Sequence, residues 1–252
     1  MILQRLLWLA ASTAVFAALV VIWHLVVENG LINRVFLPTP VSTWEALYAG
    51  ILHGSLLGAW GETVRRMIYG WLFASLLGVV LGALIGMSAQ ARAYMSGILE
   101  FIRPLPASAV VPVAIVLLGL TEYMVLAVIA FGAVWPTLLA TVHGFASVEP
   151  RLYEVGQSLR MSRWDVVRKI SLPNSVPDIL SGMRISVTVA LILTVVGEML
   201  TGRPGLGSAI ISSARMFQAP QLFAGVILLG ITGYVSSILL NLAEARLLRW
   251  RS

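Results

Sequence analysis

The chain contains no cysteine and a single lysine. Without cysteine, disulfides, thiolate nucleophiles and cysteine-bound metals are excluded. The lone lysine, Lys169, follows Arg168, whereas a phosphate-binding P-loop requires a lysine directly after glycine, so the chain carries no Walker A motif. His24, His53 and His143 are too scattered for a metal site, and serine, histidine and acidic residues show no nucleophilic arrangement. The sequence therefore predicts neither a catalytic nor a metal site.

Charged residues are also scarce, at 11% of the chain, while hydrophobic residues make up 59% and the mean hydropathy is +0.92. These values exclude an ordinary soluble domain and indicate a polytopic membrane protein. A pI of about 10.3 would also suit a nucleic-acid-binding protein. However, the basic residues lie in short segments between apolar stretches and at the C-terminus, which is typical of an inner-membrane protein. No nucleic-acid partner is expected.

Six apolar stretches of roughly 20 residues recur along the chain, which is the length that a helix rising about 1.5 Å per residue needs to cross about 30 Å of hydrocarbon. They are Leu6–Val27, Met67–Met87, Ile98–Leu120, Met124–Phe145, Val176–Leu200 and Leu222–Ala243. The first lacks a small-residue cleavage site and is expected to be retained as a helix. The fold class is therefore predicted to be all-α, with six transmembrane helices.

The basic residues predict the orientation of these spans. With both termini in the cytoplasm, twelve arginine and lysine residues fall inside and five outside, Arg65 and Arg66 being the awkward ones. This N-in, C-in arrangement places residues 154–173 in the cytoplasm. The expected parts are 1–62, the first helix and an external segment; 63–246, a core with a cytoplasmic loop at 148–175; and 247–252, a cytoplasmic tail.

A polar, basic segment stands out between the fourth and fifth apolar stretches. Four of the 17 basic residues fall in its ten positions from Arg160 to Lys169. Residues 151–159 are predicted to form a short helix, because Pro150 suits a first helical turn and the apolar residues that follow it recur on one helical face. A small Gly156 on this helix would permit close approach by another protein.

Prolines are expected to shape the chain beyond this short helix. Leu172-Pro173 should stop the next helix, and Pro177 should lie at the start of the fifth span.

This segment resembles the permease subunits of ABC importers, whose motif is Glu-Ala-Ala, three residues, Gly, nine residues and Ile-x-Leu-Pro. The spacing matches from Glu154 through Ile170, Leu172 and Pro173. Val155-Gly156 replaces the two alanines. Arg160 replaces the glycine, which would cost on the order of 1 kcal/mol if that position forms a left-handed helix cap.

Within that family, the chain is most similar to the sulfonate, taurine and nitrate group. The similarity rests on the proline-broken third span, on Pro177–Ile185 with Gly182 and Arg184, and on Glu198 followed by Gly205-Leu206-Gly207. It covers nearly the whole chain from about Thr63, and extends more loosely to Leu37–Pro40.

The resemblance implies a type I ABC importer permease fold (MetI-like) in the bacterial inner membrane, surrounded by lipid. Two permease chains, expected to be identical, would pair with two cytoplasmic ATP-binding subunits, which hold the ATP and Mg²⁺, and an external substrate-binding protein. This chain would bind no cofactor itself. Its cargo would be a small anion such as a sulfonate, taurine or nitrate.

The resemblance also assigns roles within the loop. Residues expected to contact the ATPase are Glu154, Val155, Gly156, Ser158, Leu159 and Arg160; those expected to anchor the loop to the spans are Ile170, Leu172 and Pro173. ATP binding would draw the two loops together and open the cavity outward.

Two further features suggest a translocation path or gate, each beside a simpler alternative. The run with Pro104, Pro106, Ser108 and Pro112 breaks a helix within a span, either beside a pathway or as a packing kink. Glu198 lies near the external end of the fifth span. It would latch an external gate or pair with Arg203, or else contact lipid headgroups.

Two glycine patterns are also informative. Residues 202–207 are interpreted as a turn entering a short re-entrant helix near residues 208–217, and not as a phosphate loop. Gly78, Gly82 and Gly86 repeat every fourth residue and predict a close-packing face, within the subunit or at a dimer interface. An energy-independent channel or secondary transporter, and a membrane-embedded enzyme, remain the alternative functions.

Overall fold

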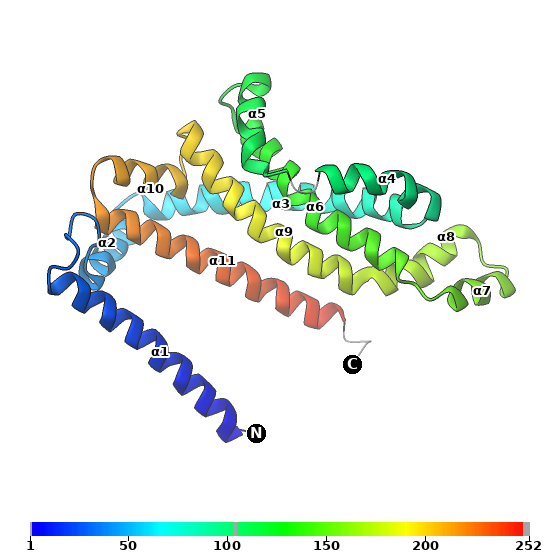
Figure 1. Cartoon of the computed structure of the whole chain (residues 1–252), viewed down its shortest axis with the longest axis horizontal. Coiled ribbons are helices and arrows are strands. Elements are labelled where there is room, and N and C mark those ends of the chain that lie inside the picture. The colour runs from blue at the N-terminus through cyan, green and yellow to red at the C-terminus, as the bar shows by residue number, and fades with distance from the viewer. Residues whose placement is uncertain (1, 103–104, 249–252) are drawn as a thin grey trace.

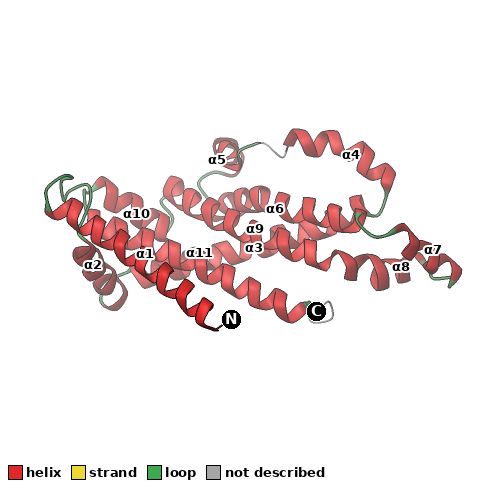
Figure 2. Cartoon of the chain, turned by 60° about the horizontal axis from the view of Figure 1, so that its bottom comes forward, coloured by secondary structure: helices red, strands yellow, loops and turns green. Residues whose placement is uncertain are grey.

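The computed structural model, shown in Figures 1 and 2, describes residues 2–102 and 105–248, and every regular element in this part of the chain is helical. The helices are α1 (Ile2–Glu28), α2 (Pro40–Leu52), α3 (Leu56–Gly86), α4 (Ala89–Ile102), η1 (Ala107–Val110), α5 (Val111–Leu118), α6 (Glu122–Ala146), α7 (Pro150–Ser158), α8 (Arg163–Val166), η2 (Val167–Ser171), α9 (Leu172–Thr201), α10 (Leu206–Arg215) and α11 (Ala219–Leu247). The predicted all-α class is confirmed.

Helices α3, α6 and α9 pack against one another and form the core of the chain. On α3, the glycine face approaches α6 so closely that an added Cβ at Gly82 would lie 2.6 Å from Thr141 Cβ and 2.7 Å from the Leu138 carbonyl oxygen. A Cβ at Gly86 would lie 2.6 Å from Phe145 Cβ. The glycine repeat therefore packs a helix of the same chain, as the spacing of small residues allows.

Within the described residues, five helices are long and apolar enough to cross a membrane: α1 from Ala10, α3, α6, the continuous stretch Arg163–Thr201, and α11. A sixth span exists if α4 and the η1–α5 segment, bent by 79°, are counted together. Helix α3 begins at Leu56, well before the predicted Met67. Three of the polar residues that lowered the hydropathy between these two positions, Thr63, Arg65 and Arg66, have partners on other helices, and the helix continues through them.

The broken third span begins new helices at its prolines. Pro106 is the N-cap of η1, and Pro112 lies in the first turn of α5, where the missing N–H leaves no intrahelical bond unmade. Pro104 lies outside the described residues. Helix α5 packs mainly on α6, and Val116 and Leu117 are 84% and 75% exposed.

Helix α2 was not expected from the hydropathy pattern. Thr39 caps it by accepting a hydrogen bond from the Ser42 N–H at 3.1 Å, and Pro40 occupies the first turn. Leu47 of α2 packs against Leu206 and residues of α11. In Figure 1, α2 and α10 lie at one end of the molecule and α7 and α8 at the other.

Helix α1 diverges from the bundle in Figure 1. Its last turns contact the rest of the chain: the Trp23 indole N–H donates to the Pro38 carbonyl at 2.8 Å, and its ring lies 6.0 Å from that of Phe223. Helix α1 runs towards the α2–α10 end and α11 runs away from it, so α1 begins and α11 ends on the same side.

Candidate functional sites

The short helix predicted at 151–159 is present as α7, and Arg160 ends it in the left-handed conformation, with φ +53°. The Arg160 N–H donates to the Gln157 carbonyl and the Met161 N–H to the Gly156 carbonyl, each at 2.9 Å. These two bonds make a Schellman cap, in which glycine is the preferred residue. The arginine therefore adopts the geometry that the family's glycine favours, with the steric cost that its Cβ brings.

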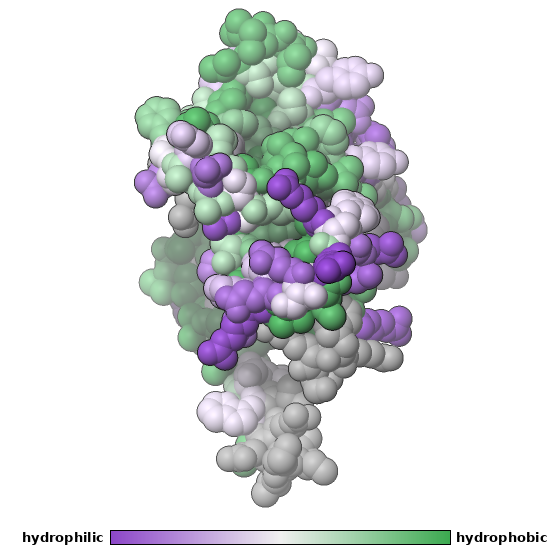
Figure 3. Space-filling model, turned by 90° about the vertical axis from the view of Figure 1, so that its right-hand side faces the viewer, coloured by the Kyte–Doolittle hydropathy of each residue, from purple (hydrophilic) through white to green (hydrophobic). Residues whose placement is uncertain are grey.

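One side of α7 is apolar and open. Leu152, Val155 and Leu159 lie on it and are 40%, 52% and 69% exposed. Trp164 of α8, beyond the cap, is 71% exposed as well. Figure 3 views the molecule from this end and shows hydrophilic side chains gathered there. We name the set Leu152, Val155 and Leu159 the α7 apolar face.

Gly156 does not lie on that face, which corrects the expectation that it admits another protein. It is the one buried residue of α7, and an added Cβ would lie 3.3 Å from Val166 Cγ2 and 3.4 Å from Ile170 Cδ1. Its small size therefore lets α7 pack on the helix that follows. Of the other residues expected to contact a partner, Glu154, Ser158 and Arg160 are exposed.

The expected helix stop at Leu172-Pro173 is wrong. Helix α8, the wide π-helical turn η2 and α9 form one continuous stretch from Arg163 to Thr201, and Pro177 lies inside α9. The Leu172 N–H donates to the Val167 carbonyl, five residues back. A π-turn just before Pro173 lets the helix pass a residue that has no N–H and whose ring would crowd the carbonyl four residues earlier.

Polar side chains fix the start of this stretch. Ser162 caps α8 by accepting from the Asp165 N–H at 3.1 Å, and Lys169 pairs with Asp165 at 2.8 Å. Ile170 packs on Gly156, and Tyr153 and the buried Ser171 share a hydrogen bond of 3.2 Å. These contacts join α7 through Ile170 and Ser171 to the stretch that continues as α9, while the anchoring role predicted for Leu172 and Pro173 stays a prediction.

A groove of about 1170 Å³ separates this region from the corner between α3 and α4. Its walls include Met87 and Gln90 on one side and Gln157, Met161 and Trp164 on the other.

At the opposite end, Glu198 is fully buried in an ion pair with Arg66 of α3. Arg66 Nη1 donates to Glu198 Oε1 at 2.9 Å, the Thr63 hydroxyl donates to Oε2 at 2.9 Å, and the Gly207 N–H donates to Oε2 at 3.0 Å. Arg66 Nη1 also donates to the Pro204 carbonyl at 2.5 Å. The carboxylate thus fastens α3 to α9 and to the start of α10.

This geometry decides between the sequence alternatives for Glu198. An ion pair with Arg203 is not formed; Arg203 donates to the Leu120 carbonyl at 3.3 Å. Contact with lipid headgroups is likewise excluded, since the side chain has no exposed surface.

Two glycines let the loop after α9 close over the carboxylate. A Cβ at Gly205 would collide with the carboxylate of Glu198, and one at Gly207 would lie 2.9 Å from its Cβ. The re-entrant helix predicted near 208–217 is α10, which begins at Leu206.

Arg66 and Thr63 are the residues of this cluster that sequence reasoning missed. In the sequence, Arg66 stands out only as one of the few basic residues that the predicted topology places outside the cytoplasm. Its side chain is 4% exposed, with Nη2 3.2 Å from Glu62 Oε2 and Nε 3.8 Å from Glu122 Oε1. A buried arginine at a span end requires a carboxylate, and that requirement is the signal that points to Glu198.

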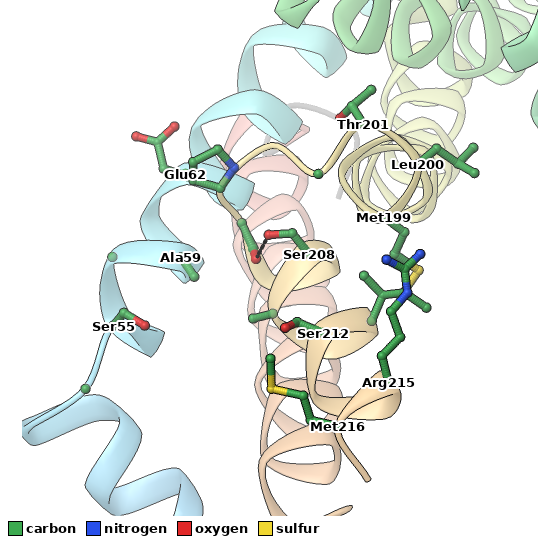
Figure 4. A pocket seen from close by; sticks show the side chains of 17 residues that line it. Ser55, Ala59, Glu62, Met199, Leu200, Thr201, Ser208, Ser212, Arg215 and Met216 are labelled. Carbon is green, nitrogen blue, oxygen red and sulfur yellow. Dashed lines mark hydrogen bonds between the residues drawn. The ribbon is translucent and has the colours of Figure 1, made fainter. Parts of the chain in front are cut away.

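Beside the cluster lies an open groove of about 1110 Å³. Figure 4 shows Ala59 and Glu62 of α3 and its N-cap Ser55 along one side, with residues of α10 such as Ser212 and Arg215 beyond them. In the broken third span, Pro106, Ser108 and Pro112 are exposed, and Ala107 packs against α6 at Gly132. The structure therefore does not bring these residues together with Glu198.

Comparison with known proteins identifies the family. Residues 74–251 match the binding-protein-dependent transport system inner membrane component. The chain belongs to this family of permeases. It is a multi-pass inner-membrane permease of an ABC transporter and not itself an ATPase. ATPase subunits and a substrate-binding protein are therefore its partners, which sets aside both alternative functions.

Relatives of the permease cover nearly all of its length. It is 31% identical to a Bacillus subtilis (strain 168) protein named as an aliphatic sulfonates transport permease, SsuC. The match covers 94% of this chain and 86% of SsuC. The permease is 27% identical to the taurine transport system permease protein TauC of Escherichia coli (strain K12), over 95% and 89%. It is 26% identical to the nitrate import permease protein NrtB of Leptolyngbya laminosa, over 92% and 85%.

Solved structures support the fold. A chain of the inward-facing MetNI methionine ABC transporter superposes with a TM-score of 0.66 at 18% identity, covering 77% of the permease and 96% of that chain. A chain of an amino acid ABC transporter gives 0.61 at 19% identity, covering 76% and 93%. The predicted type I permease fold is confirmed.

Proposed function

We propose that this permease imports a small oxyanion, such as a sulfonate, taurine or nitrate, using ATP that partner subunits bind with Mg²⁺ and hydrolyse. The cargo class is supported by the relatives named for sulfonates, taurine, nitrate and bicarbonate, at 26–31% identity. The observation that carries the proposal is the α7 apolar face, which stands open at the end of a helical stretch running to Glu198.

The length of that stretch indicates that the α7 apolar face lies outside the hydrocarbon of the membrane. From Arg163 to Thr201 there are 39 residues, or roughly 58 Å of helix, nearly twice the hydrocarbon thickness. The end with Arg163, Arg168 and Lys169 therefore projects beyond the membrane. In the proposed N-in, C-in orientation it projects into the cytoplasm, where the ATPase lies.

The proposed mechanism follows from these connections. An ATPase subunit binds the α7 apolar face, beside the basic residues Arg160, Arg163 and Arg168. Movement of α7 is passed to α9 through Gly156, Ile170 and Ser171. At the other end, Glu198 and Arg66 act as a latch of the external gate, so Glu198→Gln should alter the uptake rate.

A second copy of the chain completes the path in this proposal. Helix α5 has one packed side, and its exposed Val113, Val116 and Leu117 suit a partner helix. The bend at Pro106 and Pro112 would then face the cavity between the two copies, near Ser108. The ATPase subunits would also number two.

The test of cargo reconstitutes the permease with its ATPase subunits and binding protein in liposomes. Labelled taurine, ethanesulfonate, nitrate and bicarbonate are offered in turn. ATP-dependent import of at least one of them is expected. Import without ATP would contradict the proposed coupling to the ATPase subunits, and import of none of the four would contradict the oxyanion assignment.

The coupling role is tested with matched leucines at the two ends of the molecule. Leu159→Asp places a charge on the α7 apolar face and should abolish co-purification of the ATPase subunits without lowering the thermal stability of the permease. Leu31→Asp changes a similarly exposed leucine, 73% exposed, after α1 and should leave the complex intact. Equal ATPase recovery from both variants would refute the assigned contact.

A further inference from the structure

One face of α9 is left open by the helices of the described chain. Ser181, Ile185, Thr188 and Ile192 recur along it at helical spacing and are exposed, while the opposite side is buried against α3 and α6. The exposed face of α3 is apolar at Leu72, Phe73, Leu76, Leu77, Val80 and Leu81, as contact with lipid requires. The α9 face differs because it carries two hydroxyls.

Hydroxyls on the two sides of α9 are satisfied differently. On the packed side, Ser186 donates to the Ala133 carbonyl at 2.5 Å, and Thr194 donates to the Ala190 carbonyl at 2.7 Å. On the open side, Ser181 and Thr188 make no side-chain hydrogen bond to any described residue. A helical hydroxyl can bond the carbonyl of its own preceding turn, as Thr194 does, and one that does not is available to water or a polar ligand on this face.

Arg184 lies at the border of the same face, three residues after Ser181 and four before Thr188. Its Nη2 pairs with Glu244 Oε2 of α11, and its Nε is buried without a hydrogen-bond partner in the described chain. Counted from Thr201, Arg184 lies roughly 26 Å along the helix, near the far end of a span of about 30 Å. An arginine within a spanning helix that pairs with a carboxylate of another helix marks a candidate functional position.

We propose that Ser181, Arg184 and Thr188 form a subsite for the anionic headgroup of the cargo, and that Glu244 occupies Arg184 when no cargo is present. All three side chains are hydrogen-bond donors, and the guanidinium fork matches the spaced oxygens of a sulfonate, nitrate or bicarbonate. Arriving cargo exchanges with the Glu244 carboxylate, so the arginine is neutralised in either state. The subsite rests on the proposed oxyanion import.

The test uses the full complex with ATPase subunits and binding protein in liposomes, with taurine, ethanesulfonate, nitrate and bicarbonate as probes. Uptake and ATP hydrolysis are measured together at saturating loaded binding protein. Arg184→Gln should lower uptake per ATP hydrolysed by roughly 10- to 100-fold, since a charged hydrogen-bond pair with the cargo is lost. Glu244→Gln should not lower this ratio, because it removes the carboxylate that competes with the cargo for Arg184.

Two threonines of α9 provide a matched control. Thr188→Val removes a hydroxyl from the open face and should lower uptake per ATP roughly 2- to 10-fold. Thr194→Val removes one that is bonded to its own helix and should leave the ratio unchanged. If Arg184→Gln does not assemble, Arg184→Lys, which keeps the charge and loses the fork, is expected to give an intermediate ratio.

Several results would overturn the subsite. Equal losses in Arg184→Gln and Glu244→Gln, restored by the exchange Arg184→Glu with Glu244→Arg, would make the pair a clasp between α9 and α11. Equal ratios in Thr188→Val and Thr194→Val would remove the hydroxyl from the site. Normal uptake by Arg184→Gln would overturn the subsite alone, whereas a wild-type complex that hydrolyses ATP and imports no probe would overturn the proposed cargo as well.

Discussion

Replacing Glu198 with glutamine removes a negative charge and hardly changes the side-chain volume. The substitution therefore tests the buried cluster at the α10 end. Glu198 Oε1 accepts from Arg66, Oε2 accepts from the Gly207 N–H, and the Thr63 hydroxyl lies within 3.1 Å of both oxygens. A glutamine amide has one acceptor oxygen and one donor nitrogen. In either rotamer, its NH2 group therefore faces Arg66 or the Gly207 N–H.

The expected cost follows from burial. Glu198 is 0% and Arg66 4% exposed, so the remaining guanidinium cannot regain water. Removing one partner of a buried ion pair costs about 3–5 kcal/mol when it leaves the other charge alone. Glu62 and Glu122 still face Arg66, so Glu198→Gln should cost about 1–3 kcal/mol, the penalty of one unsatisfied buried donor. Arg66→Met leaves the Glu198 charge without a cation among the described residues and should cost the larger amount. The double variant Arg66→Met with Glu198→Met should cost less than the sum, because no charge is left without a partner.

Unfolding of the purified permease in mixed micelles, followed by tryptophan fluorescence, measures these differences. Trp60 and Trp71 on α3 lie on either side of the cluster in sequence. The control is Glu28→Gln, which breaks the exposed pair Glu28–Arg34 and should cost no more than about 1 kcal/mol. If Glu198→Gln is no more destabilising than Glu28→Gln, or if the two methionine changes simply add, the buried-pair reasoning is refuted.

Two further predictions concern backbone geometry. Arg160→Gly should stabilise the α7 cap by about 0.5–1 kcal/mol, because φ +53° suits glycine, and should slow hydrogen exchange at Met161; Gln157→Gly, inside α7, should do the opposite. Gly82→Ala should destabilise by about 1–3 kcal/mol or more, since its Cβ would meet α6, whereas Gly58→Ala, with nothing within 4 Å, should stabilise by about 0.5–1 kcal/mol. Thermal unfolding of the four variants measures whether each change stabilises or destabilises the permease. If Arg160→Gly and Gln157→Gly shift the stability in the same direction, or Gly82→Ala and Gly58→Ala do so, the geometric reasoning is contradicted.

Local sequence signals predicted the helices well where hydropathy or capping decides the outcome. The six apolar stretches all correspond to helical segments, and α7 begins where Pro150 was expected to place its first turn. Helix α2 shows the limit of hydropathy, because a polar cap and Pro40 define its start while its apolar side is short. A capping search at Thr39 would have found it.

Long-range pairing could not be predicted in the same way. Arg66 and Glu198 are 132 residues apart, and each alone looks like an isolated charge at a span end. Only the packing of α3 beside α9 brings them together and lets α3 continue through a polar stretch. The prediction that Gly156 faces another protein was wrong for a related reason. A small residue indicates a close contact, but it does not show whether the neighbour is another protein or the next helix of the same chain.

The tight packing of α9 restricts how a movement at α7 can travel. At Gly182 an added Cβ would lie 2.6 Å from Ala140 Cβ and 2.7 Å from the Pro136 carbonyl, and at Gly197 it would lie 2.8 Å from Val125 Cγ1. Both contacts join α9 to α6, one towards each end, and close-packed helices transmit a displacement instead of absorbing it. We infer that α6 and α9 move as one body, so the surface that changes its neighbours during transport is the open face of α9. That face carries Ser181, Arg184 and Thr188, so a cargo anion bound there would contact a helix that moves during transport.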